Sequence, residues 1–315
     1  MGLLFFPPMP SEIATPFFVL AGPTASGKSE LAVRVAELCG GEIVGADAFQ
    51  IYAGLDLLTA QPGPELRHRV AHHLIGVVPL TQRFDVAQYA VLARERLAEI
   101  HARGNVPIVC GGTGLYVRAL LRGLADLPGA DAALRARLEA QAPEELQRQL
   151  AELDPVSISQ LDLRNPRRVI RALEVCLLTG RPFSSFRTEW TQSESAGRGV
   201  VLHRDRAEMH QRIATRTAAM FAAGVEEEVG AISEIGPTAE LAIGFREIRE
   251  LRAGRFTREE CHRRIAESTR QYAKRQNTWF RREPGLEPIE ILPGTNLETL
   301  AATLAQRAGL KTRAD

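Results

Sequence analysis

Over the first 125 residues, the apolar positions have the pattern of strands in some segments and the spacing of helices in others. The short run 16–21 is rich in Phe and Val and is bounded by Pro and Gly, which is typical of a buried strand. The next segment, 27–38, carries apolar residues at helical spacing: Leu31, Val35 and Leu38. A second strand follows at 41–47 and ends at Asp47. The pattern therefore begins as strand, helix, strand.

The same order continues toward residue 113. A helix is predicted around Val91, Leu92, Leu97 and Ile100, and a third strand at 107–113 ends at Thr113. Strands that alternate with helices form parallel βαβ units, so we expect an α/β fold with a doubly wound parallel sheet. Ligands of such sheets bind at the carboxyl ends of the strands, where the residues after 21, Asp47 and Thr113 would meet.

From 126 to 195 the strand signals disappear and helical patterns dominate, with a glycine C-cap expected at Gly180. A strand resumes near Gly199, helices follow at 208–223 and 257–282, and a last strand is expected at 288–292. We therefore predict a catalytic core of residues 1–125 and 196–315, interrupted by a helical insertion domain of residues 126–195.

The motif GPTASGKS at 22–29 matches the phosphate-binding P-loop pattern and has the required context of a strand before it and a helix after it. Glycines let backbone amides approach phosphate oxygens, and the start of the helix adds partial positive charge. Only three of the 39 basic residues are lysine, so Lys28 marks a position that needs a compact ammonium ion. The candidate ligand-binding residues are Gly22, Thr24, Ala25, Ser26, Gly27, Lys28 and Ser29, with the Ser29 hydroxyl available for Mg²⁺.

A strand that ends in an acid is the usual partner of a P-loop in a nucleotide hydrolase, but the third strand here ends in Gly-Gly-Thr. Asp47 is the acid placed to meet a ligand on the P-loop. It could deprotonate an acceptor or hold the metal, or it could only cap the turn that follows it. Thr113 could donate its hydroxyl to a phosphate oxygen or be part of a simple turn.

The chain resembles the tRNA dimethylallyltransferases, also called tRNA isopentenyltransferases. The resemblance extends over most of the sequence, with motifs in the same order: GPTASGKS, GADAFQIYAGLDLLTAQP, HHLI, PIVCGGTGLYVRALLRGL, LDPVSISQLDLRNPRRVIRALEVCLLTGRPFS, HQRIATRTAAMFAAGVEEEV, AIGFREI and STRQYAKRQNTWFR. Several motifs in order are far more specific than a P-loop alone. Departures from the family pattern include Ser29 for Thr, Ala48 for Ser, and AIGFRE for a more usual G-Y-R-Q.

The resemblance implies the reaction. Dimethylallyl diphosphate would bind on the P-loop with Mg²⁺, and the N6 amine of the adenosine 3′ of the anticodon, position 37, would displace diphosphate in tRNAs that read codons starting with U. Asp47 would be the general base, and Lys28 and Ser29 would take up charge on the leaving group. Thr24 and Thr113 would add hydroxyl donors, and Arg216, the second arginine of an R-I-x-x-R motif, would clamp the diphosphate.

The tRNA surface implied by the resemblance combines three regions. Residues beside the base would read or stack the target adenine, which must leave its stack to be reached. Arginines in the insertion would contact backbone phosphates, as would a stripe of cations whose spacing places them on one face of the helix 257–282: Arg263, Arg270, Lys274 and Arg281. The predicted tRNA contacts are Asp47, Ala48, Phe49, Gln50, Thr113, Arg135, Arg167, Arg168, Arg171, Gly244, Phe245, Arg246, Arg270 and Lys274.

Composition excludes few classes of protein but sets the compartment we expect. Hydrophobic content of 45% and charged content of 24% are those of a globular protein, and the net charge of +1 requires any RNA surface to be a local patch. No apolar run spans a bilayer, and the N-terminal apolar stretch lacks a basic start. Four widely spaced cysteines indicate a reduced protein without structural zinc. We expect a cytoplasmic monomer that does not associate with membranes.

Three other functions are compatible with parts of this pattern. A small-molecule kinase would share the P-loop and a strand-end acid, but would leave the arginine-containing insertion without a purpose. A prenyltransferase acting on free AMP would use the same diphosphate chemistry, although the long basic C-terminal half favours a macromolecular acceptor. A non-enzymatic RNA-binding protein with a decayed P-loop would not need Lys28, Ser29, Asp47 and Arg216.

Overall fold

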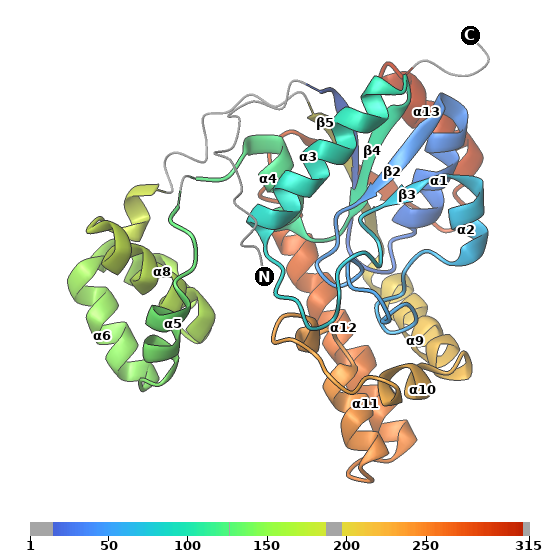
Figure 1. Ribbon diagram of the computed structural model, residues 1–315. Helices are drawn as coiled ribbons and strands as arrows, with labels where there is room; N and C mark the ends of the chain where they lie inside the picture. Colours follow the sequence, from blue (N-terminus) through green and yellow to red (C-terminus); the bar gives the residue numbers. More distant parts are fainter. Residues whose placement is uncertain (1–14, 126, 187–196, 311–315) are drawn as a thin grey trace. The chain divides into compact units, whose positions relative to one another are not determined.

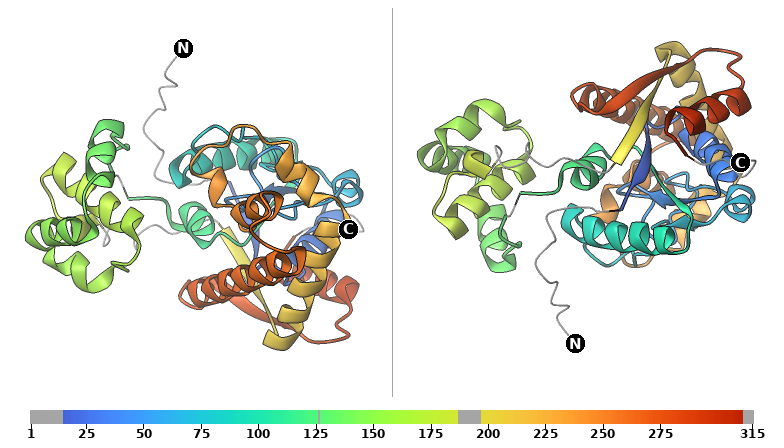
Figure 2. Two further views of the ribbon diagram at one scale, coloured as in Figure 1. Left: turned by 90° about the horizontal axis from the view of Figure 1, so that it is seen from below. Right: turned by 90° about the horizontal axis from the view of Figure 1, so that it is seen from above.

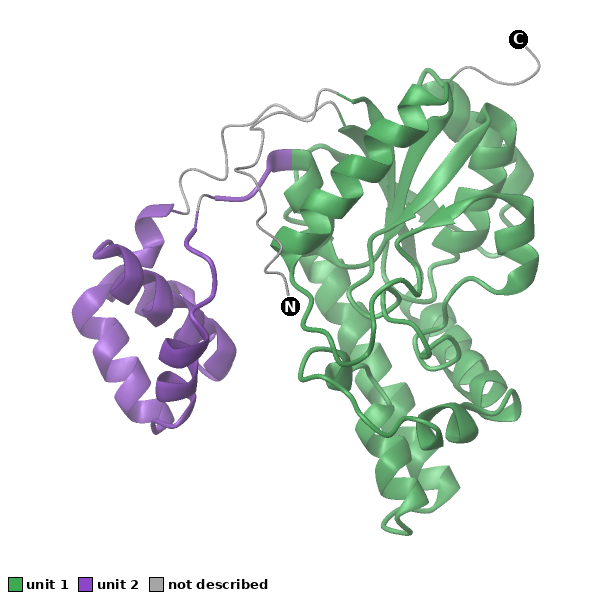
Figure 3. Cartoon of the chain, viewed as in Figure 1, with its two compact units in different colours: residues 1–121, 195–315 green, residues 122–194 purple. Residues whose placement is uncertain are grey.

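The computed structural model describes residues 15–125, 127–186 and 197–310 of the 315-residue chain. The chain divides into two compact units, one formed by residues 1–121 and 195–315 and the other by residues 122–194 (Figure 3). The larger unit contains the sheet and the P-loop, and the smaller unit is helical.

A six-stranded parallel sheet forms the centre of the larger unit (Figure 1). The strand order is β3-β2-β4-β1-β5-β6, so β4 lies between β2 and β1. The carboxyl ends of these three strands are therefore adjacent. The strands are β1 (Phe17–Ala21), β2 (Gly41–Gly45), β3 (His72–His73), β4 (Val106–Gly111), β5 (Gly197–Arg204) and β6 (Leu286–Ile291).

Strand β1 is buried on both faces, which explains its continuous apolar sequence. Phe17, Val19 and Ala21 belong to the core on one side of the sheet, and Phe18 and Leu20 belong to the core on the other. Successive side chains of a strand point to opposite faces, and a parallel sheet is covered by helices on both. The apolar run 16–21 is thus a central strand.

Helices cover both faces of the sheet (Figures 1 and 2). One face is covered by α1 (Lys28–Cys39) and α13 (Leu297–Arg307), which pack against each other. The other face is covered by α3 (Val86–Ala102) and α4 (Gly114–Arg122). A capping box fixes the start of α3: the Asp85 carboxylate accepts from the Gln88 amide, and the Gln88 side chain accepts from the Asp85 amide.

A second group of helices follows β5 and lies next to the carboxyl edge of the sheet. The longest of them, α12 (Arg258–Phe280), packs against α9 (Arg206–Ala222) (Figure 2). Their shared apolar seam of Met209, Ile213, Ala266 and Ala273 also contacts Ala25 of the P-loop. The shorter elements of the larger unit are α2 (Pro64–Arg69), α10 (Val225–Gly230), η2 (Ala239–Leu241) and α11 (Phe245–Arg252).

The smaller unit has its own apolar core, built on Leu138, Leu150 and Leu173. A fully buried acid, Glu174, accepts hydrogen bonds from Arg135 and Arg171 and from the Asp131 amide. Glu174 therefore ties α5 to α8 through paired charges. The helices of this unit are α5 (Ala132–Glu139), α6 (Pro143–Leu153), α7 (Pro155–Gln160) and α8 (Pro166–Thr179).

The doubly wound parallel sheet predicted from the sequence is confirmed, with Gly180 as the left-handed C-cap of α8. The sequence pattern did not reveal β3, which has only two residues and pairs with β2 at Ile43 and Val44. Elements of this length are too short to show a periodicity. No helix in the part of the chain that the structure describes is both long and apolar enough to span a bilayer.

Glu174 provides a test of how the smaller unit is held together. We expect Glu174→Ala to lower the free energy of unfolding of this unit by about 3–5 kcal/mol, because Arg135 and Arg171 would keep their charge without a buried partner. Hydrogen exchange of α5 and α8 amides measures the effect, and the exposed Glu152→Ala serves as the control. Unchanged protection in Glu174→Ala would contradict a structural role for the pair.

Candidate active site

The P-loop leaves β1 at Ala21 and enters α1 at Lys28, as its sequence predicts. Gly27 has φ 92° and Ala25 has φ 66°, both in the left-handed region. That conformation is uncommon for alanine and is concentrated at functional sites. The first amides of α1 have no partners within the helix, so the loop presents a helix N-terminus to a ligand.

Lys28 folds back over its own loop. Its ammonium group donates to the Pro23 carbonyl at 3.3 Å, and the side chain is half-buried at the cavity wall. Desolvation lowers the pKa of Lys28, and Arg216 lowers it further, whereas Cys110 and Asp47 raise it. A poorly solvated ammonium ion favours binding of an anion, because the anion supplies the stabilisation that water no longer gives to the charge.

Asp47 lies two residues beyond β2 and lines the same cavity as Lys28. One carboxylate oxygen, Oδ1, accepts from the Phe49 amide at 3.0 Å and from the Gln50 amide at 3.4 Å. Asp47 therefore does cap the following turn. The cap uses one oxygen only, so Oδ2 is left to act on a ligand.

Thr113 has a different environment from the one the sequence predicts. Its hydroxyl oxygen accepts from the Ala48 amide at 2.9 Å, and its own amide donates to the Ala46 carbonyl at 3.1 Å. These contacts tie Thr113 to the loop that carries Asp47 and use its hydroxyl as an acceptor, while its O–H can still donate.

Helix α9 brings two arginines to the P-loop. Arg216 is half-buried at the cavity, and desolvation lowers its pKa against an opposing effect of Asp47. Arg212, one turn earlier, donates through Nε to the Ala25 carbonyl at 2.9 Å and also lines the cavity. Arg212 was not predicted from the sequence, although its four-residue spacing from Arg216 places both on one face of α9.

The cavity that joins these groups has a volume of about 310 Å³. One part of its wall is polar and cationic, with Thr24, Lys28, Ser29 and Arg216. Another part is apolar and is formed by side chains that the sequence pattern did not single out: Leu58, Met220, Ile243 and Ile265. A ligand with an anionic head and a short hydrocarbon tail matches both parts of this wall.

Two further side chains from α12 reach this region. Tyr272 lines the cavity, and its ring lies 6.4 Å from that of Phe49. Burial and the charge of Asp47 raise the pKa of the Tyr272 hydroxyl, which therefore stays protonated at neutral pH. Gln276, one turn later, is buried and bonds to the P-loop. Their spacing alone indicates only a buried face.

The residues present could hold Mg²⁺ only together with ligand oxygens. In residues 15–125, 127–186 and 197–310, no group of three or more His, Cys, Asp or Glu side chains is arranged to bind a metal ion. Ser29 and Asp47 both line the cavity. Mg²⁺ commonly binds through one or two protein oxygens plus substrate phosphates, so this donor set fits a metal that arrives with a diphosphate.

Of the residues expected to read the target base, some line the cavity and others are used within the fold. Phe49 and Gln50 line the cavity, but the Gln50 amide group already donates to the Thr59 and Ala60 carbonyls. Ala48 uses its backbone amide to bond Thr113. Tyr52 is 1% exposed and bonds Thr238, so it belongs to the core.

The expectation for the start of α11 needs correction. Phe245 is 1% exposed and packs in the main core, so its side chain has no surface to offer RNA. Gly244 is buried beneath Leu58 and has φ 97°, which explains the glycine by the turn that starts the helix. Arg246 is exposed.

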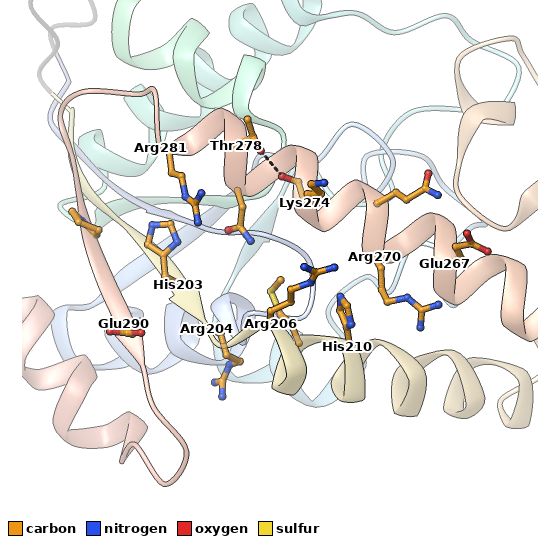
Figure 4. A pocket seen from close by; sticks show the side chains of 14 residues that line it. His203, Arg204, Arg206, His210, Glu267, Arg270, Lys274, Thr278, Arg281 and Glu290 are labelled. Carbon is orange, nitrogen blue, oxygen red and sulfur yellow. Dashed lines mark hydrogen bonds between the residues drawn. The ribbon is translucent and has the colours of Figure 1, made fainter.

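A second, larger cavity of about 1040 Å³ is bordered by β5, β6, α9 and α12 (Figure 4). Arg270 and Lys274 of α12 and Arg281, which caps its end, line this cavity together, as their spacing predicts. Arg263 of the same expected stripe instead pairs with Glu260 and Glu267. The opposite wall adds His203, Arg204, Arg206 and His210, so cations outnumber the two acids, Glu267 and Glu290.

The arginines of the smaller unit fall into two groups. Arg135 and Arg171 bind the buried Glu174 at 2.9 and 2.5 Å, and their side chains are half-buried. Arg167 and Arg168 are exposed at the start of α8. Of the four predicted contacts in the insertion, these two are the exposed ones.

The fold, the loop after β1 and the cavity define a P-loop α/β protein that binds a phosphorylated ligand. The family model described as IPP transferase matches residues 50–283, and the chain belongs to this family. The match begins after the P-loop and Asp47, so the assignment of those residues depends on their geometry.

Similar proteins cover nearly the whole chain. A tRNA dimethylallyltransferase from Geobacter sulfurreducens is 43% identical over 88% of this chain and 92% of its own length. A tRNA dimethylallyltransferase from Akkermansia muciniphila is 40% identical over 92% of this chain and 98% of its own length. Among solved structures, a tRNA isopentenylpyrophosphate transferase from Bacillus halodurans aligns with TM-score 0.67 and 30% identity, covering 94% of this chain and 97% of that one. A eukaryotic dimethylallyltransferase acting on tRNA aligns with TM-score 0.78 and 25% identity, covering 94% and 78%.

Lys28 provides a test of the electrostatics of the site. We expect Lys28→Met to raise the free energy of unfolding of the ligand-free protein at pH 7 by ~0.5–2 kcal/mol, because it removes a poorly solvated charge. We also expect it to abolish diphosphate binding. The lowered pKa means that the unfolded state binds more protons just below the ordinary value of 10.5. As the pH rises toward 10.5, the free energy of unfolding of the wild type therefore increases. The difference in this free energy between Lys28→Met and wild type becomes smaller. Urea unfolding from pH 7 to 10.5 measures this, and a constant difference would contradict it.

Proposed function

We propose that this chain is a tRNA dimethylallyltransferase. It transfers the dimethylallyl group of dimethylallyl diphosphate to N6 of adenosine 37, 3′ of the anticodon, in tRNAs that read codons starting with U. The observation that carries the proposal is the 310 Å³ cavity, in which a P-loop and Arg216 face an apolar wall and one free oxygen of an acid. A kinase would need no apolar wall beside its phosphates.

The step is a substitution at the allylic carbon. The adenosine amine forms a new C–N bond, the C–O bond to diphosphate breaks, and the electron pair of that bond leaves with the diphosphate. Oδ2 of Asp47 takes the amine proton, while Oδ1 keeps the turn in place. The Thr113 hydroxyl, which accepts from the Ala48 amide, supports the Asp47 loop and thereby orients the base.

Charge on the leaving diphosphate is met by groups that are already in place. Lys28, Arg216, the Thr24 hydroxyl and the loop amides surround the anionic end of the cavity. Mg²⁺, held by the Ser29 hydroxyl together with the diphosphate, would screen the same charge and leave Oδ2 of Asp47 to take the proton. The dimethylallyl tail lies against Leu58, Met220, Ile243 and Ile265, where a metabolite hydroxyl would find no partner.

The macromolecular acceptor is supported by the distribution of cations. A protein with net charge +1 nevertheless gathers Arg270 and Lys274 of α12, with Arg281 at its end, on one face. We infer that this face binds the tRNA backbone and that the smaller unit contributes Arg167 and Arg168. We further propose that the enzyme acts as a cytoplasmic monomer, because a tRNA anticodon stem-loop already provides a large partner surface.

The reaction is tested by transfer of radiolabelled dimethylallyl diphosphate to unmodified tRNA. We expect label in tRNA and none in AMP, and a loss of about 10²–10⁴ in kcat for Asp47→Asn. Asn keeps the Oδ1 acceptor of the turn and removes the charge, so tRNA affinity and thermal stability should stay near wild type. Transfer by Asp47→Asn near the wild-type rate, with loss only in Asp47→Ala, would show that Asp47 acts through the turn alone.

The tRNA surface is tested by Arg270→Ala combined with Lys274→Ala. We expect weaker tRNA binding and a salt slope shallower by about 1–2, because each lost phosphate contact removes about one unit. Filter binding from 50 to 300 mM salt measures both. The charge-matched control is Arg96→Ala with Arg307→Ala, two exposed arginines that pair with acids on α3 and β6. An equal change in the control would assign the effect to net charge rather than to this face.

A further inference from the structure

Helix α12 inserts one polar side chain into the carboxyl edge of the sheet. Gln276 is 5% exposed, and its amide group bonds to two different loops. Oε1 accepts from the Thr24 amide of the P-loop at 2.8 Å, and Nε2 donates to the Gly112 carbonyl after β4 at 2.8 Å. A single side chain thus joins segments that are more than 80 residues apart in sequence.

The polarity of these two bonds permits only one orientation of the amide. Thr24 offers an N–H and Gly112 offers a carbonyl, so an acceptor must face the first and a donor the second. Glutamate would present an oxygen to the Gly112 carbonyl, and leucine would satisfy neither group. Because Gln276 is buried, an unmet partner would not be compensated by bulk water.

The backbone beside Gln276 is adapted to this contact. A Cβ on Gly112 would lie 2.3 Å from Nε2 of Gln276 and 3.1 Å from the Gly22 carbonyl. The glycine therefore provides space for the amide group rather than a special backbone conformation. Gly112 lies at the end of the strand where a nucleotide hydrolase would have an acid. Here the glycine leaves room for Gln276.

The link continues to the acid. Thr113 follows Gly112 directly, and its hydroxyl accepts from the Ala48 amide next to Asp47. The Gly22 amide in turn donates to the Gly111 carbonyl at 3.3 Å. Gln276 of α12 thereby connects the P-loop to the end of β4, and Thr113 connects the end of β4 to the Asp47 turn.

We propose that Gln276 is a positioning residue that fixes the P-loop relative to the end of β4, so that the diphosphate and the base are held at a set separation. It touches no reacting atom and acts through the Thr24 amide and the Gly112 carbonyl. The inference relies on the proposed function only for the identity of the ligand, since the two bonds themselves hold a phosphate-binding loop.

The test compares Gln276→Leu and Gln276→Glu with wild type. We expect each to raise the KM for dimethylallyl diphosphate and the Kd for inorganic diphosphate, measured by calorimetry, about tenfold, the scale of leaving one buried partner unsatisfied. Affinity for tRNA should change less than twofold. Leu97→Ala in α3 is the stability control, because it removes a fully buried side chain that lines neither cavity.

Two results would overturn the proposal. The first is a Gln276→Leu variant that loses as much thermal stability as Leu97→Ala but keeps the wild-type KM and Kd, which would make Gln276 a packing residue. The second is additivity of Gly112→Ala and Gln276→Ala, since both act on one contact and should lose less together than the sum of their separate losses. Absence of transfer by wild type would reject the proposed function, whereas diphosphate titration of the same variants would still decide the role of Gln276.

Discussion

The site depends on a loop that presents the backbone amides at the start of α1 to a ligand and whose carbonyls are satisfied by other groups. The Pro23 carbonyl accepts from Lys28, the Ala25 carbonyl from Arg212, and the Ser26 carbonyl from Arg204. Each donor is a cation, so the same contacts that hold the loop also make its surroundings positive. Glu208 pairs with Arg204 and offsets part of this charge.

This arrangement explains why the larger unit needs α9 and α12 in addition to a doubly wound sheet. The sheet brings the ends of β1, β4 and β2 together, but it supplies few side chains to the cavity. Arg212 and Arg216 come from α9, and Tyr272 comes from α12. The apolar seam between the two helices includes Ala25, so helix packing and loop geometry are coupled.

Charge in the molecule is concentrated rather than abundant. The chain is nearly neutral, yet cations collect at the P-loop cavity and at the cavity beside α12. Elsewhere, arginines pair with acids, as Arg135 and Arg171 do with Glu174. Belonging to the IPP transferase family is consistent with two anionic substrates of different size.

The sequence by itself determined the order of strands and helices, the P-loop, and the edge of the sheet where Asp47 would meet it. Those properties depend on local periodicity and on spacing within one segment, which a sequence displays directly. Only the tertiary structure decided the partners of Thr113, the burial of Phe245 and the commitment of Arg135 to Glu174. Each of these results from contacts between residues distant in the chain, where residue type sets what a side chain can bond but packing sets what it meets.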